Sequence, residues 1–133
     1  MIEHTTQLRV RYAETDTMGY VYYGNYPTYY EVARTELMRS LGSSYRKLEE
    51  EGIMMPVISL QIHYKQPAFY DDLLNIRTVI KALSPTRITF GYEIFNESGD
   101  LINVGETTLI FISSSSKKPV RAPSWFLDLL SDL

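Results

Sequence analysis

Apolar residues recur along the first half of the chain with the period of an α-helix. Between residues 26 and 41 they are spaced three and four apart, which places them on one continuous helical face. The members of this stripe are Tyr26, Tyr29, Tyr30, Ala33, Leu37 and Leu41. Asn25 before Pro27 is typical of a helix start, and Gly42 is typical of a helix end. The pattern therefore predicts one long amphipathic helix that buries a tyrosine-rich face.

A second pattern, the alternation of apolar and polar residues, predicts β-strands. One such segment precedes the helix, with its apolar positions at Leu8, Val10 and Tyr12. The four later segments are Val57–Lys65, Leu73–Leu83, Arg87–Asn96 and Leu101–Ile112. Ser84-Pro85 and Glu97–Asp100 are short turn sequences, so the strands that they join should form antiparallel hairpins.

Smaller elements are expected between and after the strands. Ser44–Glu51 is typical of a short helix, with Ser44 as its cap and Gly52 as its end. Ser113–Ser116 should form a polar loop, and Pro123–Leu130 a terminal helix. One long helix against one antiparallel sheet is an α+β architecture, which we expect to form a single domain over residues 1–133.

The last predicted strand favours an oligomer. Leu101–Ile112 is apolar on both faces at its end, which favours a position near the sheet centre. One helix covers only one face of such a sheet, so we expect the remaining apolar surface to be buried between copies of the chain.

Composition narrows the class of protein. The net charge of −3 argues against a general nucleic-acid binder. The chain has no cysteine, which excludes disulfides, thiolate chemistry and cysteine-ligated zinc. The first six residues lack the basic and apolar segments of a signal peptide, and no apolar run approaches the roughly 20 residues of a membrane span. We therefore expect a cytoplasmic protein that does not insert into membranes.

Asp16 is the leading candidate for chemistry. It lies between the first strand and the helix start, three residues before Gly19. The first N–H groups of a helix have no intrahelical acceptor and can stabilise an oxyanion. A carboxylate beside them can act on a carbonyl as nucleophile or as general base, and the sequence leaves both roles open.

Other catalytic groups are poorly placed. His4 is near the terminus and His63 lies on the polar side of a strand, without a nucleophile-elbow pattern nearby. Histidine and carboxylate residues show no metal-ligand spacing, so we expect no metal site. Glu31 and Glu36 are rival carboxylates on the predicted helix, although Glu31 and Arg34 have the spacing of a surface ion pair.

Three segments carry a family resemblance. They are Asp16-x-x-Gly19-x-Val21-Tyr22-Tyr23-x-Asn25-Tyr26, Glu31-x-Ala33-Arg34-Thr35-Glu36 and Ile62-x-Tyr64-x-x-Pro67-Ala68-x-Tyr70-x-Asp72. The chain resembles the hotdog-fold acyl-CoA thioesterases, in the branch of 4-hydroxybenzoyl-CoA thioesterase and the Tol–Pal-associated short-chain enzymes. The resemblance implies a long helix wrapped by a five- or six-stranded antiparallel sheet. It also implies a homodimer, or a tetramer made of two dimers, with active sites at the interfaces.

The resemblance assigns roles to residues near the helix start. It places the catalytic aspartate at Asp16 and the oxyanion donor at the backbone N–H of Tyr23. Short-chain members often carry histidine at the Tyr23 position, whereas the aromatic-acyl enzyme carries tyrosine. The residues expected to contact the acyl group are Gly19, Val21, Tyr22 and Tyr26.

Coenzyme A carries phosphates, so a basic patch is expected to bind it. The candidates are Arg87, Lys117, Lys118 and Arg121, with donors from the serine loop, and a solvated basic loop is the alternative. No cofactor is expected, because coenzyme A is part of the substrate. The expected activity is hydrolysis of an acyl-CoA thioester to free acid and CoA. An acyl-carrier-protein thioesterase and a non-catalytic acyl-CoA-binding module remain alternatives, and the preferred acyl group stays open.

Overall fold

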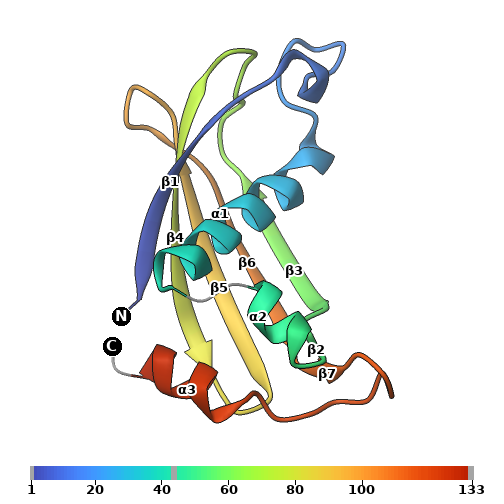
Figure 1. The fold of residues 1–133 in the computed structure, drawn as a ribbon. Helices are drawn as coiled ribbons and strands as arrows, with labels where there is room; N and C mark the ends of the chain where they lie inside the picture. Colours follow the sequence, from blue (N-terminus) through green and yellow to red (C-terminus); the bar gives the residue numbers. More distant parts are fainter. Residues whose placement is uncertain (1, 43–44, 132–133) are drawn as a thin grey trace.

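Five antiparallel strands curve around one long helix (Figure 1). The computed structural model describes residues 2–42 and 45–131. The strands of the main sheet lie in the order β1-β4-β5-β6-β3. Their bounds are β1, Glu3–Arg9; β3, Val57–Tyr64; β4, Leu73–Leu83; β5, Arg87–Phe95; and β6, Leu101–Ile110. A small second sheet pairs β2, Ile53–Met54, with β7, Ile112–Ser113.

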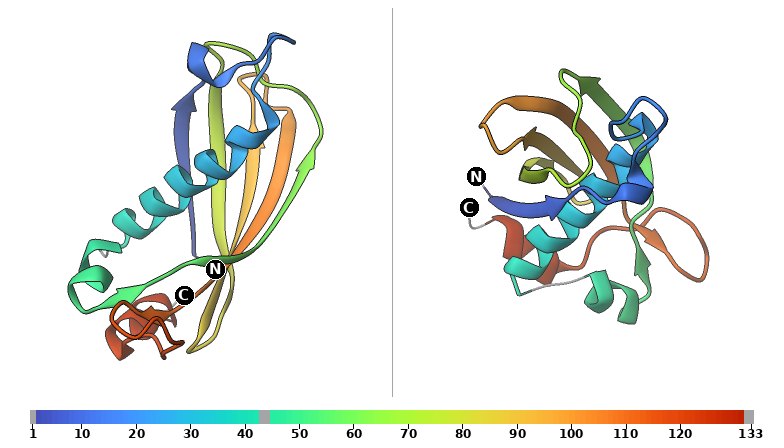
Figure 2. Two further views of the ribbon diagram at one scale, coloured as in Figure 1. Left: turned by 90° about the vertical axis from the view of Figure 1, so that its right-hand side faces the viewer. Right: turned by 90° about the horizontal axis from the view of Figure 1, so that it is seen from above.

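The helices occupy one side of the main sheet. Their bounds are α1, Tyr26–Ser40; α2, Tyr45–Glu50; and α3, Ser124–Ser131, with 3-10 turns η1, Tyr12–Glu14, and η2, Tyr23–Asn25. Figure 2 shows α1 lying across the concave face of the sheet, with α2 and α3 toward the end where β4 turns into β5. The three predicted helices and the two predicted hairpins are therefore confirmed. Ser44, the expected cap of α2, lies outside the described residues.

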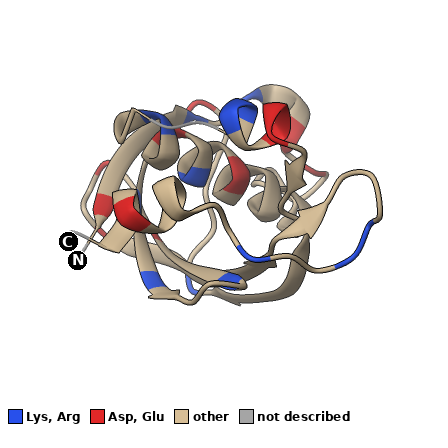
Figure 3. Ribbon diagram, turned by 60° about the horizontal axis from the view of Figure 1, so that its bottom comes forward, with Lys and Arg blue, Asp and Glu red and all other residues tan. Residues whose placement is uncertain are grey.

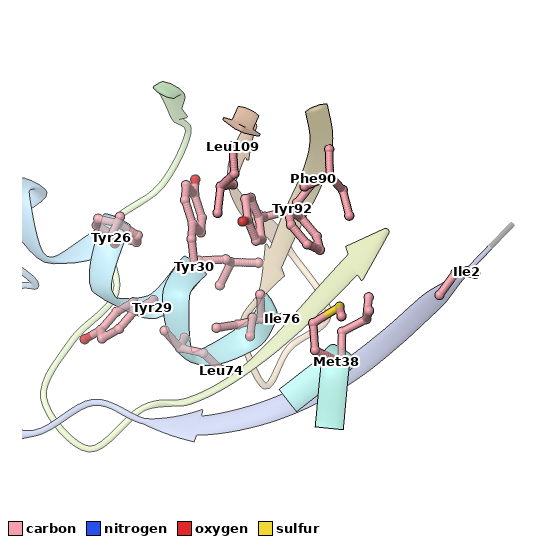
Figure 4. Close-up of a cluster of buried hydrophobic side chains, with 14 of the residues drawn as sticks. Ile2, Tyr26, Tyr29, Tyr30, Met38, Leu74, Ile76, Phe90, Tyr92 and Leu109 are labelled. Carbon is pink, nitrogen blue, oxygen red and sulfur yellow. The ribbon is translucent and has the colours of Figure 1, made fainter. Parts of the chain in front are cut away.

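The tyrosine-rich face of α1 forms the centre of the core (Figure 4). Tyr30 stacks on Tyr92 of β5, with ring centroids 4.2 Å apart and an interplanar angle of 2°. Gly105 of β6 makes this approach possible, because a Cβ at that position would lie 2.2 Å from the Tyr30 hydroxyl oxygen. Leu41, which the stripe also includes, is only half-buried because α1 has ended before it. The helix-to-sheet distance is thus set by one aromatic stack and one glycine.

The first strand is longer and earlier than the sequence pattern predicts. It begins at Glu3 and ends at Arg9, so the expectation that Tyr12 continues it is wrong. Tyr12 instead starts η1 and is 76% exposed, because Glu14 accepts hydrogen bonds from Arg11 and turns the chain out of the extended conformation. The strand pairs with β4, a long-range contact that the sequence did not indicate.

Two smaller expectations also need correction. The Asn25 side chain does not cap α1 but donates to the carbonyl of Glu14 at 2.8 Å. In β4 the alternation of apolar and polar residues expected over Leu73–Leu83 ends early, because a shift in register between Ile80 and Ala82 turns Ala82 toward solvent.

The side of the sheet away from α1 is polar, and the exposed apolar residues lie elsewhere. Arg77 forms ion pairs with Glu3 and Glu93 across three strands, and Lys81 pairs with Glu106 at 2.8 Å. Exposed apolar side chains lie instead on the edge strand β3, at Val57, Ile58, Leu60 and Tyr64. The apolar surface that favours an oligomer is therefore at an edge of the sheet rather than on its open face.

Candidate active site

Asp16 lies in a tight turn between η1 and α1. Its backbone N–H donates to the carbonyl of Tyr20 at 3.0 Å, and its carbonyl accepts from Gly19 at 3.0 Å. Gly19 has a φ of +88°, a conformation that favours glycine. The Met18 N–H donates to Asp16 Oδ1 at 2.9 Å. The turn thus holds one carboxylate oxygen by a main-chain donor, and the side chain is half-buried.

The Asp16 turn forms one wall of a cavity of about 390 Å³. We call it the Asp16 cavity, and it is lined by Asp16, Met18, Tyr20, Val21, Tyr23, Tyr26, Tyr64, Lys65, Gln66 and Pro67. The predicted residues Asp16, Val21, Tyr23 and Tyr26 are therefore brought together. Gly19 shapes the turn without lining the cavity, and Tyr22 packs outside it against the Tyr23 ring.

The Tyr23 backbone supplies a free donor at this cavity. Tyr23 is the first residue of η2, which runs directly into α1, and the first N–H groups of a helix have no intrahelical acceptor. Within residues 2–42 and 45–131, the Tyr23 N–H donates no hydrogen bond. Its carbonyl accepts a hydrogen bond from the Tyr64 hydroxyl at 2.9 Å, which ties the helix start to the end of β3.

Glu14 holds this region together although it does not line the cavity. Its Oε1 accepts from the Arg11 N–H at 2.9 Å and from the Tyr29 hydroxyl at 2.8 Å. Its carbonyl accepts from the Tyr22 N–H and from the Asn25 side chain. Burial acts to raise the pKa of Glu14, but hydrogen bonds from Arg11 and Tyr29 outweigh it and lower the pKa. The carboxylate therefore fastens the Asp16 turn to α1.

Two tyrosines of the cavity, Tyr26 and Tyr64, keep their protons near neutral pH because their pKa values are raised. Burial, with a smaller contribution from Tyr64, raises the pKa of Tyr26 to about 12. Burial also raises the pKa of Tyr64. These two phenols can form hydrogen bonds and apolar contacts, and Asp16 is the carboxylate among the residues that line the cavity.

The rival glutamates are not at the Asp16 cavity. Glu36 pairs with Arg39 on the exposed side of α1. Glu31 lies at the mouth of a different cavity. The predicted surface pair of Glu31 with Arg34 is wrong, because Arg34 is buried and has no carboxylate within 4.0 Å among the described residues.

The four basic residues expected to bind coenzyme A lie far from Asp16 within one chain. The β4–β5 turn and the loop after β7 are at the opposite end of the sheet from the Asp16 turn (Figure 1). Figure 3, which brings this end forward, shows basic residues along the loop after β7. The Ala122 N–H donates to the Pro85 carbonyl at 2.8 Å, which holds Arg121 near the turn that precedes Arg87. Lys117 is partly engaged, since its ammonium donates to the Ser114 carbonyl.

Sequence reasoning missed part of the cavity wall. The missed residues are the last one of β3, Tyr64, and the three that follow the strand, Lys65, Gln66 and Pro67. The third motif contains Tyr64 and Pro67, but motif matching alone assigned them no role. Among the described residues there is no group of three or more histidine, aspartate or glutamate side chains that could hold a metal ion.

A sheet curved around one long helix is the hotdog architecture, and a carboxylate beside an unpaired helix-start amide is suited to hydrolysis at a carbonyl carbon. The chain belongs to the thioesterase-like superfamily, whose profile matches residues 10–130.

Individual relatives agree with this assignment. The Bacillus subtilis (strain 168) protein described as a putative acyl-CoA thioesterase, YneP, is 36% identical over 92% of this chain and 88% of its own length. The acyl-CoA thioester hydrolase YbgC of Escherichia coli O6:H1 is 34% identical over 87% of each chain. The structure of DHNA-CoA thioesterase from Staphylococcus aureus superposes with a TM-score of 0.94 at 41% identity, covering 99% of this chain and 91% of that one.

Proposed function

We propose that the chain hydrolyses an acyl-CoA thioester to the free acid and CoA at the Asp16 cavity. The observation that supports this most directly is that one cavity is lined by both Asp16 and Tyr23, and that the Tyr23 N–H donates no hydrogen bond among the described residues. The names of the relatives supply the substrate class, a coenzyme A thioester.

In the proposed reaction, the thioester carbonyl oxygen accepts a hydrogen bond from the Tyr23 N–H. Either an Asp16 oxygen attacks the carbonyl carbon, or Asp16 takes a proton from a water that attacks it. In both routes the carbon–sulfur bond breaks and CoA leaves as the thiol after protonation. In the first route water then hydrolyses the mixed anhydride and restores Asp16. The main-chain donor at Met18 holds one oxygen of Asp16 and orients the other.

Coenzyme A binding by Arg87, Lys117, Lys118 and Arg121 belongs to the same proposal. Because these residues lie at the far end of one chain, they can reach an Asp16 cavity only in a second copy. We therefore propose a homodimer, or a tetramer of two dimers, with shared active sites and no further cofactor. Mass measurement of the purified protein in solution tests this state, and a monomer with full turnover would contradict it.

We also propose that the enzyme is cytoplasmic and has no nucleic-acid or membrane partners. The net charge of −3 supports the first exclusion. In the described residues, none of the helices has the length and apolar character needed to cross a bilayer.

Asp16→Asn tests the chemistry. Asparagine can still accept the Met18 N–H, so the turn should form, while nucleophile and base are lost. We expect turnover to fall by about 100-fold or more across a panel of short, long and aromatic acyl-CoA thioesters, measured by thiol release. Asp100→Asn, in an exposed turn, is the matched control and should retain wild-type turnover.

Undiminished hydrolysis by folded Asp16→Asn would refute the mechanism. Faster hydrolysis of an acyl-carrier-protein thioester than of the same acyl-CoA would show that the substrate's acyl group is carried by acyl-carrier protein rather than by CoA. Tight acyl-CoA binding without any hydrolysis by the wild-type protein would reassign the chain as a binding module.

A further inference from the structure

A second cavity lies along the middle of α1, between that helix, α2 and β2. Its volume is about 400 Å³. We call it the Arg34 cavity, and its lining includes Arg34, Tyr45, Leu48, Ile53, Met54 and Met55. It shares no lining residue with the Asp16 cavity. Arg34 is eight residues beyond Tyr26, which is about 12 Å along the helix axis.

Arg34 is an unusual residue for this position because its charge is buried without a counter-ion. The residue is 8% exposed, yet no carboxylate lies within 4.0 Å of it among the described residues. Its Nε is buried and has no hydrogen-bond partner, and Nη1 makes only a long hydrogen bond of 3.4 Å to the Tyr92 hydroxyl. A buried charge is costly unless it is paired and hydrogen-bonded, so the site lacks an anion.

Tyr45 adds a second unused polar group. Its hydroxyl is buried and has no hydrogen-bond partner within the described part of the chain. Burial raises the pKa of Tyr45, so the phenol keeps its proton and can donate it to an acceptor. The neighbouring Tyr92 hydroxyl is already engaged with Thr107 Oγ1 at 2.6 Å. The Arg34 guanidinium lies close to the Tyr45 hydroxyl, and both groups can donate hydrogen bonds to an anion.

The rest of the wall is apolar. Leu48 and Leu109 are buried, Ile53 is partly buried, and Met54 and Met55 are flexible side chains that can adapt to a ligand. A cavity of this size with few polar groups suits a small organic molecule.

The mouth of the cavity carries charges of both signs. Glu31 and Glu49 line it and are exposed, so their repulsion of an anion is screened by water. Lys117 Nζ lies 3.8 Å from Met54 Sδ, which places a cation close to the same mouth.

We propose that the Arg34 cavity binds a small organic carboxylate, with the carboxylate on the Arg34 guanidinium and the Tyr45 hydroxyl and the hydrocarbon body against Leu48 and the methionines. A guanidinium fork is the side chain best matched to a carboxylate. The site does not depend on thioester hydrolysis, because its residues are separate from those at Asp16.

The test uses binding to the intact protein with no thioester present. Benzoate and hexanoate are titrated calorimetrically against their neutral matches, benzamide and hexanamide. We expect the carboxylates to bind at least about tenfold more tightly than the amides. Arg34→Gln and Tyr45→Phe should weaken carboxylate binding, the first by about tenfold or more. Arg39→Gln, an exposed arginine on the same helix, is the control and should bind as the wild type does.

Methionine methyl NMR locates the ligand. Met54 and Met55 line the Arg34 cavity, whereas Met18 lines the Asp16 cavity. We expect benzoate to shift the signals of Met54 and Met55. A shift confined to Met18, equal affinity for benzoate and benzamide, or no detectable binding would overturn the proposal.

Two further variants keep the test decisive if Arg34→Gln does not fold. Arg34→Lys keeps the charge but loses the planar fork, so it should weaken carboxylate binding. The double variant of Arg34→Lys with Tyr45→Phe should weaken binding further, because both polar contacts are then altered. Glu31→Gln should tighten carboxylate binding by about twofold, because it removes repulsion at the mouth. Unchanged affinity in Arg34→Lys and Tyr45→Phe alike would overturn the assignment.

Discussion

The two cavities along α1 use charge in opposite ways. At the Asp16 cavity the charged group is half-buried and is held by a main-chain donor, so it keeps contact with water and stays reactive. At the Arg34 cavity the charged group is buried, its Nε has no hydrogen-bond partner and no carboxylate lies within 4.0 Å among the described residues. In our proposals the first charge takes part in hydrolysis, and the second is neutralised by a bound carboxylate.

The two cavity regions also differ in the interactions that determine their shape. The Asp16 turn is organised by backbone hydrogen bonds and by Glu14, so a few local residues decide its shape. The Arg34 cavity is formed by side chains from α1, α2 and β2, so it depends on packing between distant segments. The first region should respond to backbone changes and the second to side-chain changes.

The largest effect is expected from removing the Tyr23 N–H. Tyr23→Pro should fit the first position of a helical turn, because proline fixes a suitable φ; it removes the N–H donor together with the tyrosine ring. We expect kcat to fall by about 100-fold or more, or roughly 3 kcal/mol of barrier. Steady-state kinetics on acyl-CoA thioesters measure it.

Tyr23→Ala is the matched control for that variant. It removes the same ring but keeps the N–H, so its kcat should stay well above that of Tyr23→Pro. Equal loss in both variants would show that the ring, not the amide, matters to turnover.

A smaller effect is expected from Glu14→Gln, which weakens the hydrogen bonds that fasten the Asp16 turn to α1. The Glu14 side chain is 12% exposed, and we expect a loss of about 1–2 kcal/mol in the free energy of unfolding. Denaturant unfolding measures the change. Benzoate affinity at the Arg34 cavity should not change, and a parallel loss there would show that the two regions are coupled.

The pH dependence of the same variant has a definite sign. The pKa of Glu14 in the folded protein is below its ordinary value of 4.5, so its stabilising effect is complete above that pH. The effect is lost as the pH falls through the folded-state pKa. Wild-type stability should therefore decline more steeply below pH 4.5 than that of Glu14→Gln. Parallel acid-unfolding curves would contradict this role.

Arg34→Met should raise stability, because it replaces a buried unpaired charge with an apolar side chain of similar length. We expect a gain of about 1 kcal/mol in the free energy of unfolding without ligand. Saturating benzoate should narrow the difference, since only the wild type gains a counter-ion. A destabilised Arg34→Met protein would show that Arg34 is already well paired in solution.

The smallest effect is expected from Arg39→Gln on the exposed side of α1. Its ion pair with Glu36 is open to solvent, and such pairs contribute about 0.5 kcal/mol or less. Thermal unfolding should hardly change. A loss as large as that in Glu14→Gln would contradict the expected difference between this exposed ion pair and the less exposed hydrogen bonds of Glu14.

The sequence predicted features that follow from local spacing. The stripe from Tyr26 to Leu37 identified the buried face of α1, and the turn residues at Ser84 and Pro85 identified a hairpin. The pairing of β1 with β4 could not be found this way, because it depends on residues about seventy positions apart.

The site was predictable to the same extent. Asp16 and Tyr23 are close in sequence and line one cavity, whereas Tyr64 and Lys65 reach it only through the sheet. Arg34 was misplaced because its spacing from Glu31 matches a surface pair. It also lies four residues beyond Tyr30 and four before Met38, and that row faces inward.

The unpaired donor at the start of η2 has a consequence for how such proteins diversify. Every residue except proline carries a backbone N–H, so the side chain at position 23 is free to vary while the donor is retained. Substitutions there can alter the wall of the Asp16 cavity without removing the main-chain donor that we propose for the oxyanion. If the proposed mechanism holds, a lineage can change substrates one residue at a time at the very position whose main chain assists the reaction.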